Sequence, residues 1–358
     1  MLITDENIQR SSEWLVTSLR QEYTGLMQGG ERYNSISDYL KKEFGTKTIK
    51  LSIDAGFTCP NRDGTCGVGG CAFCSAGGSG ELASVYSPGS IATAIDEQIA
   101  INSTKWPDAK YLAYFQAHTN TYAPVEELRV KYNEALDDPR ISGIVIATRP
   151  DCLPVDVLDL LEEINKEHFM WVELGLQTIH AKTSEYLGIG YPLSDYDRAV
   201  EELTKRGIKV VTHLILGLPT PSDNIDNLDD NHSSDLVYKQ ASIVCESEDM
   251  MFQSLRYVCS KPIWGLKLHL LNVVKGSRLY AMQPDYVSFN TIEEYVDLVV
   301  RCLELIPPEI TIHRLTGDVP RNLLVSPEWS YHKRTILNKI NYELKLRETR
   351  QGENLIEG

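Results

Sequence analysis

Apolar and polar positions along the chain switch repeatedly between two patterns. Short apolar runs bounded by turn-forming residues predict buried β-strands. Apolar stripes with spacings of three and four residues predict amphipathic helices between them. The predicted strands are 48–54, 109–116, 143–148, 170–177, 208–219 and 264–274, with one more from 310. The predicted helices are 12–26, 94–106, 125–136, 154–166, 194–207 and 291–305.

Two of the predicted helices begin with a capping-box pair. Ser194 with Asp197, and Thr291 with Glu294, place a hydroxyl three residues ahead of a carboxylate. Each member of such a pair accepts a hydrogen bond from a backbone N–H that the helix leaves free. The helix that follows Ser194 is predicted to stop at Gly207.

The alternation of strand and helix, repeated about six times, predicts an α/β fold with parallel strands and right-handed crossovers. Polar residues recur at or near the carboxyl ends of these strands, where the active sites of barrels form. They are Gln116, His118, Arg149, Asp151, Glu173, Gln177, His213, Lys267 and His269. This recurrence favours a partial (βα)6 barrel of the TIM type over a doubly wound sheet.

The length of 358 residues suits one large α/β domain with appendages. We predict a helical extension over 1–46, the barrel over 47–305, and a C-terminal extension over 306–358 that contains a basic helix. An insertion at about 220–260 interrupts the barrel. Its first part is acidic and has no apolar face, which is typical of a lid or a disordered loop.

Composition and charge restrict the classes of partner. No run approaches the ~18 apolar residues of a membrane span, and the N-terminus lacks a signal-peptide pattern, so we expect a cytoplasmic protein without membrane contact. The formal net charge of −15 does not point to nucleic acid. The C-terminal basic segment fits either a solvated helix face or a phosphate-binding patch. Its basic residues are Lys333, Arg334, Lys339, Lys345, Arg347 and Arg350.

Four of the eight cysteines lie between positions 59 and 74, with the spacing Cys59-x6-Cys66-x4-Cys71-x2-Cys74. In a reducing compartment, clustered cysteines more often bind metal than form disulfides. A closed zinc site usually pairs two short knuckles, and only Cys71–Cys74 is one. Three thiolates around an iron–sulfur cluster would instead leave one iron open on the active face. Thiols that are merely neighbours are the third possibility.

The spacing Cys59-x11-Cys71-x2-Cys74, with Phe73 before the last cysteine, resembles that of the radical S-adenosylmethionine (SAM) enzymes. Among these, the chain is most similar to the YhcC/YtqA-like family, in the branch related to the elongator-complex catalytic subunit. Further matching stretches follow in the expected order. They are GFTCPNRDGT, YFQAHTNTYAPVEEL, TRPDCLP, WVELGLQTIH, HLILGLP, WGLKLHLL and LTGDVPRNLL. The resemblance implies a radical SAM type of partial barrel.

The same resemblance implies a set of site residues. The implied ligands of a [4Fe–4S] cluster are Cys59, Cys71 and Cys74, with Cys66 outside the set. The implied SAM contacts are Gln116, Arg149, Glu173 and Gln177, with backbone around Gly217 facing the adenine. From their position on the last barrel strand, Lys267 and His269 are predicted to reach the substrate, and structural hydrogen bonding explains them equally well. Where relatives carry an arginine that helps hold the SAM carboxylate, this chain has Ile189.

The reaction implied by the resemblance is reductive cleavage of SAM to a 5′-deoxyadenosyl radical that abstracts hydrogen from the substrate. Flavodoxin or ferredoxin is the implied class of electron donor. The implied substrate is tRNA, at a wobble-uridine carboxymethylaminomethyl group that is trimmed to aminomethyl. Three alternatives stay open: radical chemistry on a small metabolite or peptide, a zinc-binding structural or interaction protein using all four clustered cysteines, and a chain that kept the fold and lost the chemistry. The sequence leaves the oligomeric state undefined.

Overall fold

The computed structural model describes residues 32–75, 77, 78, 83, 90–222 and 242–355. The predicted helix at 12–26 and the acidic stretch 223–232 of the predicted insertion lie outside these residues. Within the described ranges, strands and helices alternate as the apolar pattern predicts.

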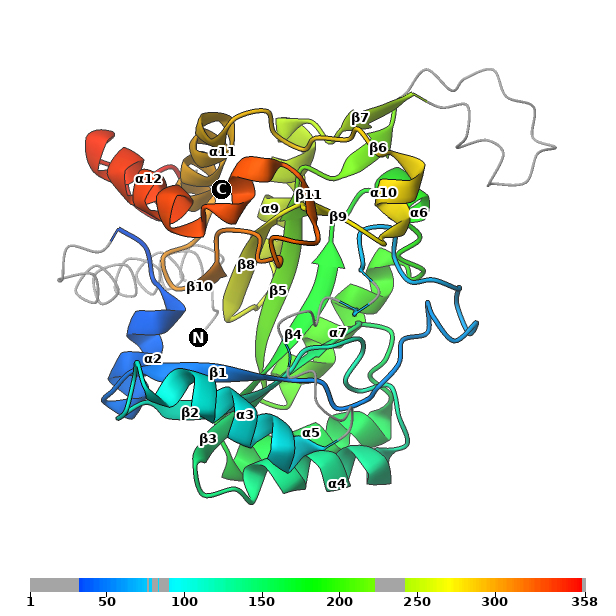
Figure 1. Ribbon diagram of the computed structural model, residues 1–358, viewed down its shortest axis with the longest axis vertical. Helices are drawn as coiled ribbons and strands as arrows, with labels where there is room; N and C mark the ends of the chain where they lie inside the picture. The colour runs from blue at the N-terminus through cyan, green and yellow to red at the C-terminus, as the bar shows by residue number, and fades with distance from the viewer. Residues whose placement is uncertain (1–31, 76, 79–82, 84–89, 223–241, 356–358) are drawn as a thin grey trace, which may run out of the picture.

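Seven parallel strands form one curled sheet, a half-barrel (Figure 1). They are β1 (Thr48–Ile53), β2 (Lys110–Phe115), β3 (Ile141–Thr148), β4 (Met170–Gln177), β5 (Lys209–Leu216), β8 (Gly265–Leu270) and β10 (Thr311–Arg314). Their order in the sheet is their order along the chain, as expected for a barrel built by successive crossovers in one direction. The predicted α/β partial barrel is confirmed, with one strand more than six.

Helices cover the outer face of the sheet (Figure 1). They are α3 (Ile91–Ser103), α4 (Val125–Leu136), α5 (Val155–Glu167), α7 (Leu193–Lys205), α9 (Glu248–Cys259) and α11 (Ile292–Leu305). Alternate strand residues such as Leu51, Phe115 and Ile146 share one large buried cluster with helix residues such as Leu128 and Leu158. Because both faces of the strands are covered, the strands are apolar nearly throughout.

Helix α2 (Ile36–Phe44) fills the half-barrel near the amino ends of the strands. Leu40 shares a buried cluster with Trp171 and other inward-facing residues of the sheet. Just before the helix, the carbonyl of Asn34 accepts a hydrogen bond from the backbone N–H of Ile312 in β10, at 2.7 Å. The helix also contacts β1, so it joins the two edges of the open sheet and leaves the carboxyl ends of the strands accessible.

The remaining elements decorate this frame. They are α6 (Ala181–Leu187), α10 (Arg278–Met282), α12 (Lys333–Leu346), a 3-10 helix (Glu328–Tyr331), and two small antiparallel pairs, β6 (Pro219–Pro221) with β7 (Ile243–Cys245) and β9 (Val273–Val274) with β11 (Leu324–Ser326). Two elements of the barrel lie in stretches that were predicted as the C-terminal extension and the insertion. Strand β10 follows residue 305 yet pairs with β8, and α9, within 220–260, packs against β5.

The two predicted capping boxes have different outcomes. In α11, the Thr291 hydroxyl and the Glu294 carboxylate form the reciprocal pair, so that prediction is confirmed. The prediction at Ser194 is wrong, because α7 begins after Pro192 and has no side-chain cap. Asp197 instead accepts hydrogen bonds from the Tyr257 hydroxyl, at 2.7 Å. None of the helices in the described ranges has the length and apolar character that a bilayer crossing needs.

Candidate active site

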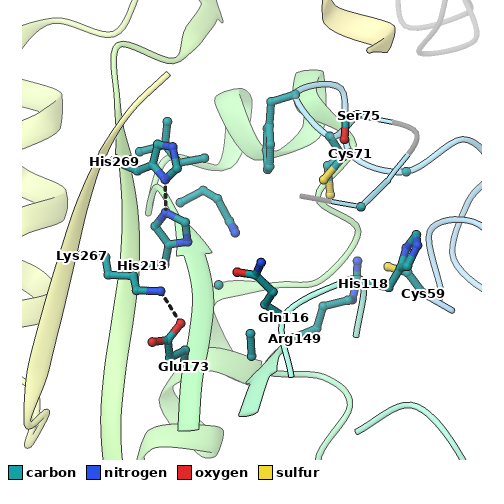
Figure 2. Close-up of a pocket in the computed structure, with 18 of the residues that line it drawn as sticks. Cys59, Cys71, Ser75, Gln116, His118, Arg149, Glu173, His213, Lys267 and His269 are labelled. Atoms are coloured by element: carbon teal, nitrogen blue, oxygen red, sulfur yellow. Dashed lines mark hydrogen bonds and ion pairs between the residues drawn. The ribbon is translucent and has the colours of Figure 1, made fainter. Parts of the chain in front are cut away.

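A cavity of about 230 Å³ opens at the carboxyl ends of the strands, beside the loop that carries the clustered cysteines. Nine of the ten predicted site residues line it: Cys59, Cys71, Cys74, Gln116, Arg149, Glu173, Gln177, Lys267 and His269. Figure 2 shows Cys59, Cys71 and Arg149 toward one end of this cavity, and Glu173, Lys267 and His269 toward the other. We call these the cysteine end and the inner end.

Backbone and side-chain hydrogen bonds fix the cysteine loop to the barrel. The N–H of Ala72 donates to the carbonyl of Leu187 at 2.8 Å, and the carbonyl of Ala72 accepts from the N–H of Leu279 at 2.7 Å. The Asn61 amide donates to the Sγ of Cys71 at 3.2 Å and to the carbonyl of Ile189 at 2.9 Å. The thiols are thus held at a defined depth in the cavity.

The donor set fits an iron–sulfur cluster held by three thiolates. A hydrogen bond with Cys74 lowers the pKa of Cys71 to about 7 against the effect of burial, helped by Asn61 and by the positive charges of Arg149 and Arg278, and a thiolate is the form that binds metal. Within the described residues, no three Cys, His, Asp or Glu side chains gather at the spacing that a single ion needs.

Cys66 stands apart from the other three cysteines of the loop. It is exposed and lines a second cavity, on the side of Tyr122 and Cys152, rather than the first. A zinc knot made by all four clustered cysteines needs four thiolates around one ion. The position of Cys66 does not fit that arrangement.

Arg149 connects the end of β3 to the turn around Ile189. Its Nε and Nη2 donate to the two carboxylate oxygens of Asp151 at 2.9 and 2.8 Å, and its Nη1 donates to the carbonyl of Ile189 at 3.0 Å. The guanidinium also lies over the ring of Tyr191, 4.8 Å from the centroid. Arg149 therefore brings a positive charge to the turn where relatives are expected to carry an arginine and this chain has a buried Ile189.

Two residues, one at the end of β4 and one just after β2, adopt a backbone conformation that L-residues seldom take. His118 has φ of 61° and Gln177 has φ of 69°, and both line the cavity. Tyr191 donates a hydrogen bond to Oε1 of Gln177 at 3.1 Å. Strained backbone of this kind concentrates at functional sites, and here it turns polar side chains toward the cavity. Figure 2 shows Gln116 between the cysteine end and the inner end.

At the inner end, the Glu173 carboxylate is contacted by four donors. Lys50 and Trp171 donate to Oε1 at 3.3 and 3.1 Å. Tyr114 donates to Oε2 at 2.6 Å, and Lys267 forms an ion pair with the same oxygen. Burial alone would raise the pKa of Glu173, but Lys267 and Lys50 hold it well below its usual value. The predicted SAM contact is thus engaged with lysines at the end away from the cysteines.

Lys267 and two histidines complete the inner end. Burial lowers the pKa of Lys267 to about 7 despite the neighbouring Glu173. His213 and His269 stack, with Nε2 of His213 3.0 Å from Nδ1 of His269. Burial and nearby cations lower the pKa of His213 to about 3 and keep the pKa of His269 well below its ordinary value, so both imidazoles are neutral at pH 7.

Gly217 is the predicted site residue that the structure does not bring to this cavity. It is absent from the cavity lining and packs so closely on Ser288 and Phe289 that an added Cβ would meet them at 2.6 and 2.7 Å. Its φ of 84° and this close approach both require glycine. The residue therefore has a packing role that explains its presence at the end of β5.

The comparisons with known proteins decide the family. The radical SAM superfamily model matches residues 59–230, and the Radical_SAM C-terminal domain model matches 263–346. The Bacillus subtilis protein YtqA is 41% identical over 90% of this chain and 92% of its own length, and Escherichia coli YhcC is 35% identical over 86% and 91%. The chain belongs to the radical SAM superfamily, in the YhcC/YtqA-like family.

More distant relatives of this radical SAM protein lie in the elongator branch. The tRNA uridine(34) acetyltransferase of Methanocaldococcus jannaschii is 24% identical over 54% of this chain and 31% of its own length. The solved archaeal Elp3 of Methanocaldococcus infernus has the same fold, with a TM-score of 0.54, 15% identity, and coverage of 72% of this chain and 59% of that one. The predicted relation to the elongator branch is confirmed.

The cofactors of the superfamily, and so of this radical SAM protein, are a [4Fe–4S] cluster and SAM. The residues that would hold the cluster are the three thiols of the cysteine end. Several polar residues of the cavity were not among the predicted site residues, and they include Tyr114, Tyr191 and Arg314. A signal existed for Arg314, because it ends a strand of the sheet as the recognised polar residues do.

Proposed function

We propose that this radical SAM protein converts the carboxymethylaminomethyl group of a tRNA wobble uridine into an aminomethyl group. Supporting this substrate is the similarity to a protein named for its action on tRNA uridine 34, together with the solved Elp3 that shares the fold. The inner end of the cavity, lined by Lys267 and His269, offers polar groups to a modified base that leaves its stack.

Cys59, Cys71 and Cys74 hold the cluster in this proposal, and Gln116 and Gln177 hold SAM. When bound, these cofactors supply a 5′-deoxyadenosyl radical that removes a hydrogen atom from the substrate. The substrate radical formed at the carboxymethyl carbon gives one electron to the carrier that reduced the cluster, which is of the flavodoxin or ferredoxin class. The neighbouring N–H loses its proton, and the nitrogen and this carbon are then joined as an imine. Water then splits the resulting imine into the aminomethyl product and glyoxylate. Lys267 and His269 contact the substrate.

A strain that lacks the gene tests this proposal. Mass spectrometry of its tRNA nucleosides is expected to show carboxymethylaminomethyl-uridine accumulating and aminomethyl-uridine lost. Wild-type protein and the Cys66→Ser variant restore the product, whereas Cys71→Ser does not, and only Cys71→Ser lowers the iron and sulfide content of the purified protein. An unchanged nucleoside profile in the deletion strain would falsify the proposal.

A small metabolite or peptide is the second candidate substrate, and two observations favour it. The net charge is −15, and four of the six basic side chains in and after α12 are already in ion pairs. These pairs are Lys333–Asp318, Lys339–Glu293, Arg347–Asp297 and Arg350–Glu353. A helix whose charges are used within the chain has fewer left for phosphates.

A further inference from the structure

At the inner end of the cavity, each carboxylate is shared by two basic side chains. Glu173 serves two lysines at once, Lys50 and Lys267. Burial lowers the pKa of both lysines even though Glu173 opposes that effect. One carboxylate is therefore shared between two lysines.

The same sharing recurs beside it. The Asp318 carboxylate, which lines the cavity, accepts a hydrogen bond from Lys333 at 2.7 Å. The guanidinium of Arg314 lies 3.9 Å from the same oxygen. Together, the two carboxylates Glu173 and Asp318 are shared among four basic side chains, Lys50, Lys267, Arg314 and Lys333, of which Lys267 and Arg314 line the cavity.

Arg314 is the least engaged of these cations. Its guanidinium carries five N–H donors, and within the described residues its side chain donates no hydrogen bond; the 3.9 Å contact with Asp318 is too long for one. The side chain nevertheless lines the cavity and is three-quarters buried. A guanidinium held at a cavity wall with free donors is well suited to a carboxylate that arrives with a ligand.

Strand register places Arg314 beside Lys267. Arg314 of β10 pairs with Lys267 of β8, which pairs in turn with His213 of β5. The three residues form one row across neighbouring strands, and all three side chains line the cavity. Figure 2 shows Lys267 and His213 at the inner end, across the cavity from Cys59 and Cys71. The free donors of Arg314 thus belong to the end that is away from the thiols.

We propose that Arg314 and Lys267 form a carboxylate subsite that receives the acidic group of the substrate side chain. This inference rests on the proposed function, in which the substrate ends in a carboxylate and the product in an amine. The subsite would hold the carboxymethylaminomethyl group through charge-assisted hydrogen bonds. It would repel the aminomethyl product, which carries a positive charge, so the conversion itself would favour release.

Binding to the full-chain, anaerobically reconstituted holoenzyme tests the subsite. The probes are two anticodon stem–loops that differ only in the wobble uridine, one with carboxymethylaminomethyl and one with aminomethyl. Wild-type protein is expected to bind the acidic probe about 10- to 100-fold more tightly.

Arg314→Met should remove most of this preference, and Arg314→Lys should keep part of it. Arg321→Met is the matched control, because Arg321 is exposed and outside the cavity lining.

The outcomes separate the subsite from the proposed function. Equal binding of both probes by wild-type protein overturns the subsite and leaves tRNA as the substrate. The subsite is also overturned if Arg314→Met lowers the affinity for both stem–loops equally. It is likewise overturned if the variant lowers the affinity for SAM while the preference for the acidic stem–loop stays. Failure of both stem–loops to bind at all overturns the proposed function, and the inference with it. Circular dichroism melts confirm that each variant is folded, and Arg314→Lys keeps the test decisive if the methionine variant is not.

Discussion

Glu173 is a buried carboxylate on which the inner end of the cavity depends. Four donors contact its two oxygens, and its side chain is 4% exposed. The carboxylate compensates two buried ammonium groups, which on their own would be costly to keep away from water. No single ion pair of Glu173 stabilises the protein strongly, but removing the carboxylate would leave two buried ammonium groups without a carboxylate partner, which is costly.

Replacing Glu173 by Gln is expected to destabilise the protein by about 3–5 kcal/mol, because Lys50 and Lys267 lose their shared partner. Urea unfolding of the two proteins at pH 7 measures the difference. Glu126→Gln is the control, since Glu126 is exposed and lies 4.0 Å from Arg129, and its loss should cost less than about 0.5 kcal/mol.

The same variant has a pH signature. Lysine neighbours hold the pKa of Glu173 well below its ordinary value, so its contribution is complete above the unfolded pKa of about 4.3 and is lost as pH falls through the folded pKa. The difference in unfolding free energy between wild-type protein and Glu173→Gln should therefore become smaller below about pH 4. A deficit that is constant from neutral to acidic pH would show that the charge of Glu173 is not the cause.

Two helices of the barrel begin in different ways. Helix α11 has a reciprocal capping box at Thr291 and Glu294. Helix α7 begins after Pro192, and Ser194, where the sequence predicts the cap, lies exposed inside the first turn. The carboxylate of Asp197, which the predicted box would have used, is taken by Tyr257 and Lys261 of the neighbouring α9 region. A tertiary contact has thus replaced a local cap.

Thr291→Ala is expected to lower the free energy of unfolding by about 1 kcal/mol, because a backbone N–H at the start of α11 loses its acceptor. Ser194→Ala, the matched control, should change it by less than about 0.5 kcal/mol. Thermal or urea unfolding of both variants measures the contrast. Equal losses would mean that α7 uses the Ser194 hydroxyl as a cap in solution.

The whole molecule has an excess of acidic residues, and many of its basic side chains are engaged in ion pairs. The chain carries 35 basic and 50 acidic residues, and ion pairs within the chain engage much of the basic segment around α12. Arg334 and Lys345 are exposed and have no ion pair in the part of the chain that the structure describes. If tRNA binds along this helix, these two residues are the ones available to its phosphates.

The double variant Arg334→Ala/Lys345→Ala is expected to weaken tRNA binding and to reduce the slope of log affinity against log salt by about 1.5 to 2. Lys339→Ala/Arg350→Ala, which removes two paired cations, should reduce the slope by much less. Filter binding at several salt concentrations provides the slopes. Equal reductions in both double variants would argue against phosphate contacts that are specific to Arg334 and Lys345.

Local patterns predicted much of the fold and part of the site. Strand β4 and helix α4 begin and end where their patterns predict. The apolar residues of β4 are buried on both faces of the strand, and those of α4 form one buried stripe, so each pattern marks the extent of its element. Nine predicted site residues line one cavity, since parallel strands bring their carboxyl ends to one edge. Their chemical roles remain predictions. The contact of the Gly217 backbone with the adenine also stays a prediction, and the packing of Gly217 against Ser288 and Phe289 involves a distant segment that the local pattern does not encode.

The order of strands and helices, the thiol spacing and the family were determined by the sequence alone, because each is encoded among residues close together along the chain. Only the tertiary structure decided which charges meet. Curling of the sheet and the register of β8 with β10 bring Lys267 and Arg314 to one end of a cavity, beside the Glu173 that Lys50 also contacts. The tertiary structure also places Cys66 away from the other three cysteines of the loop, beside a second cavity. Charges interact through distance in space, and separation along the chain does not encode that distance.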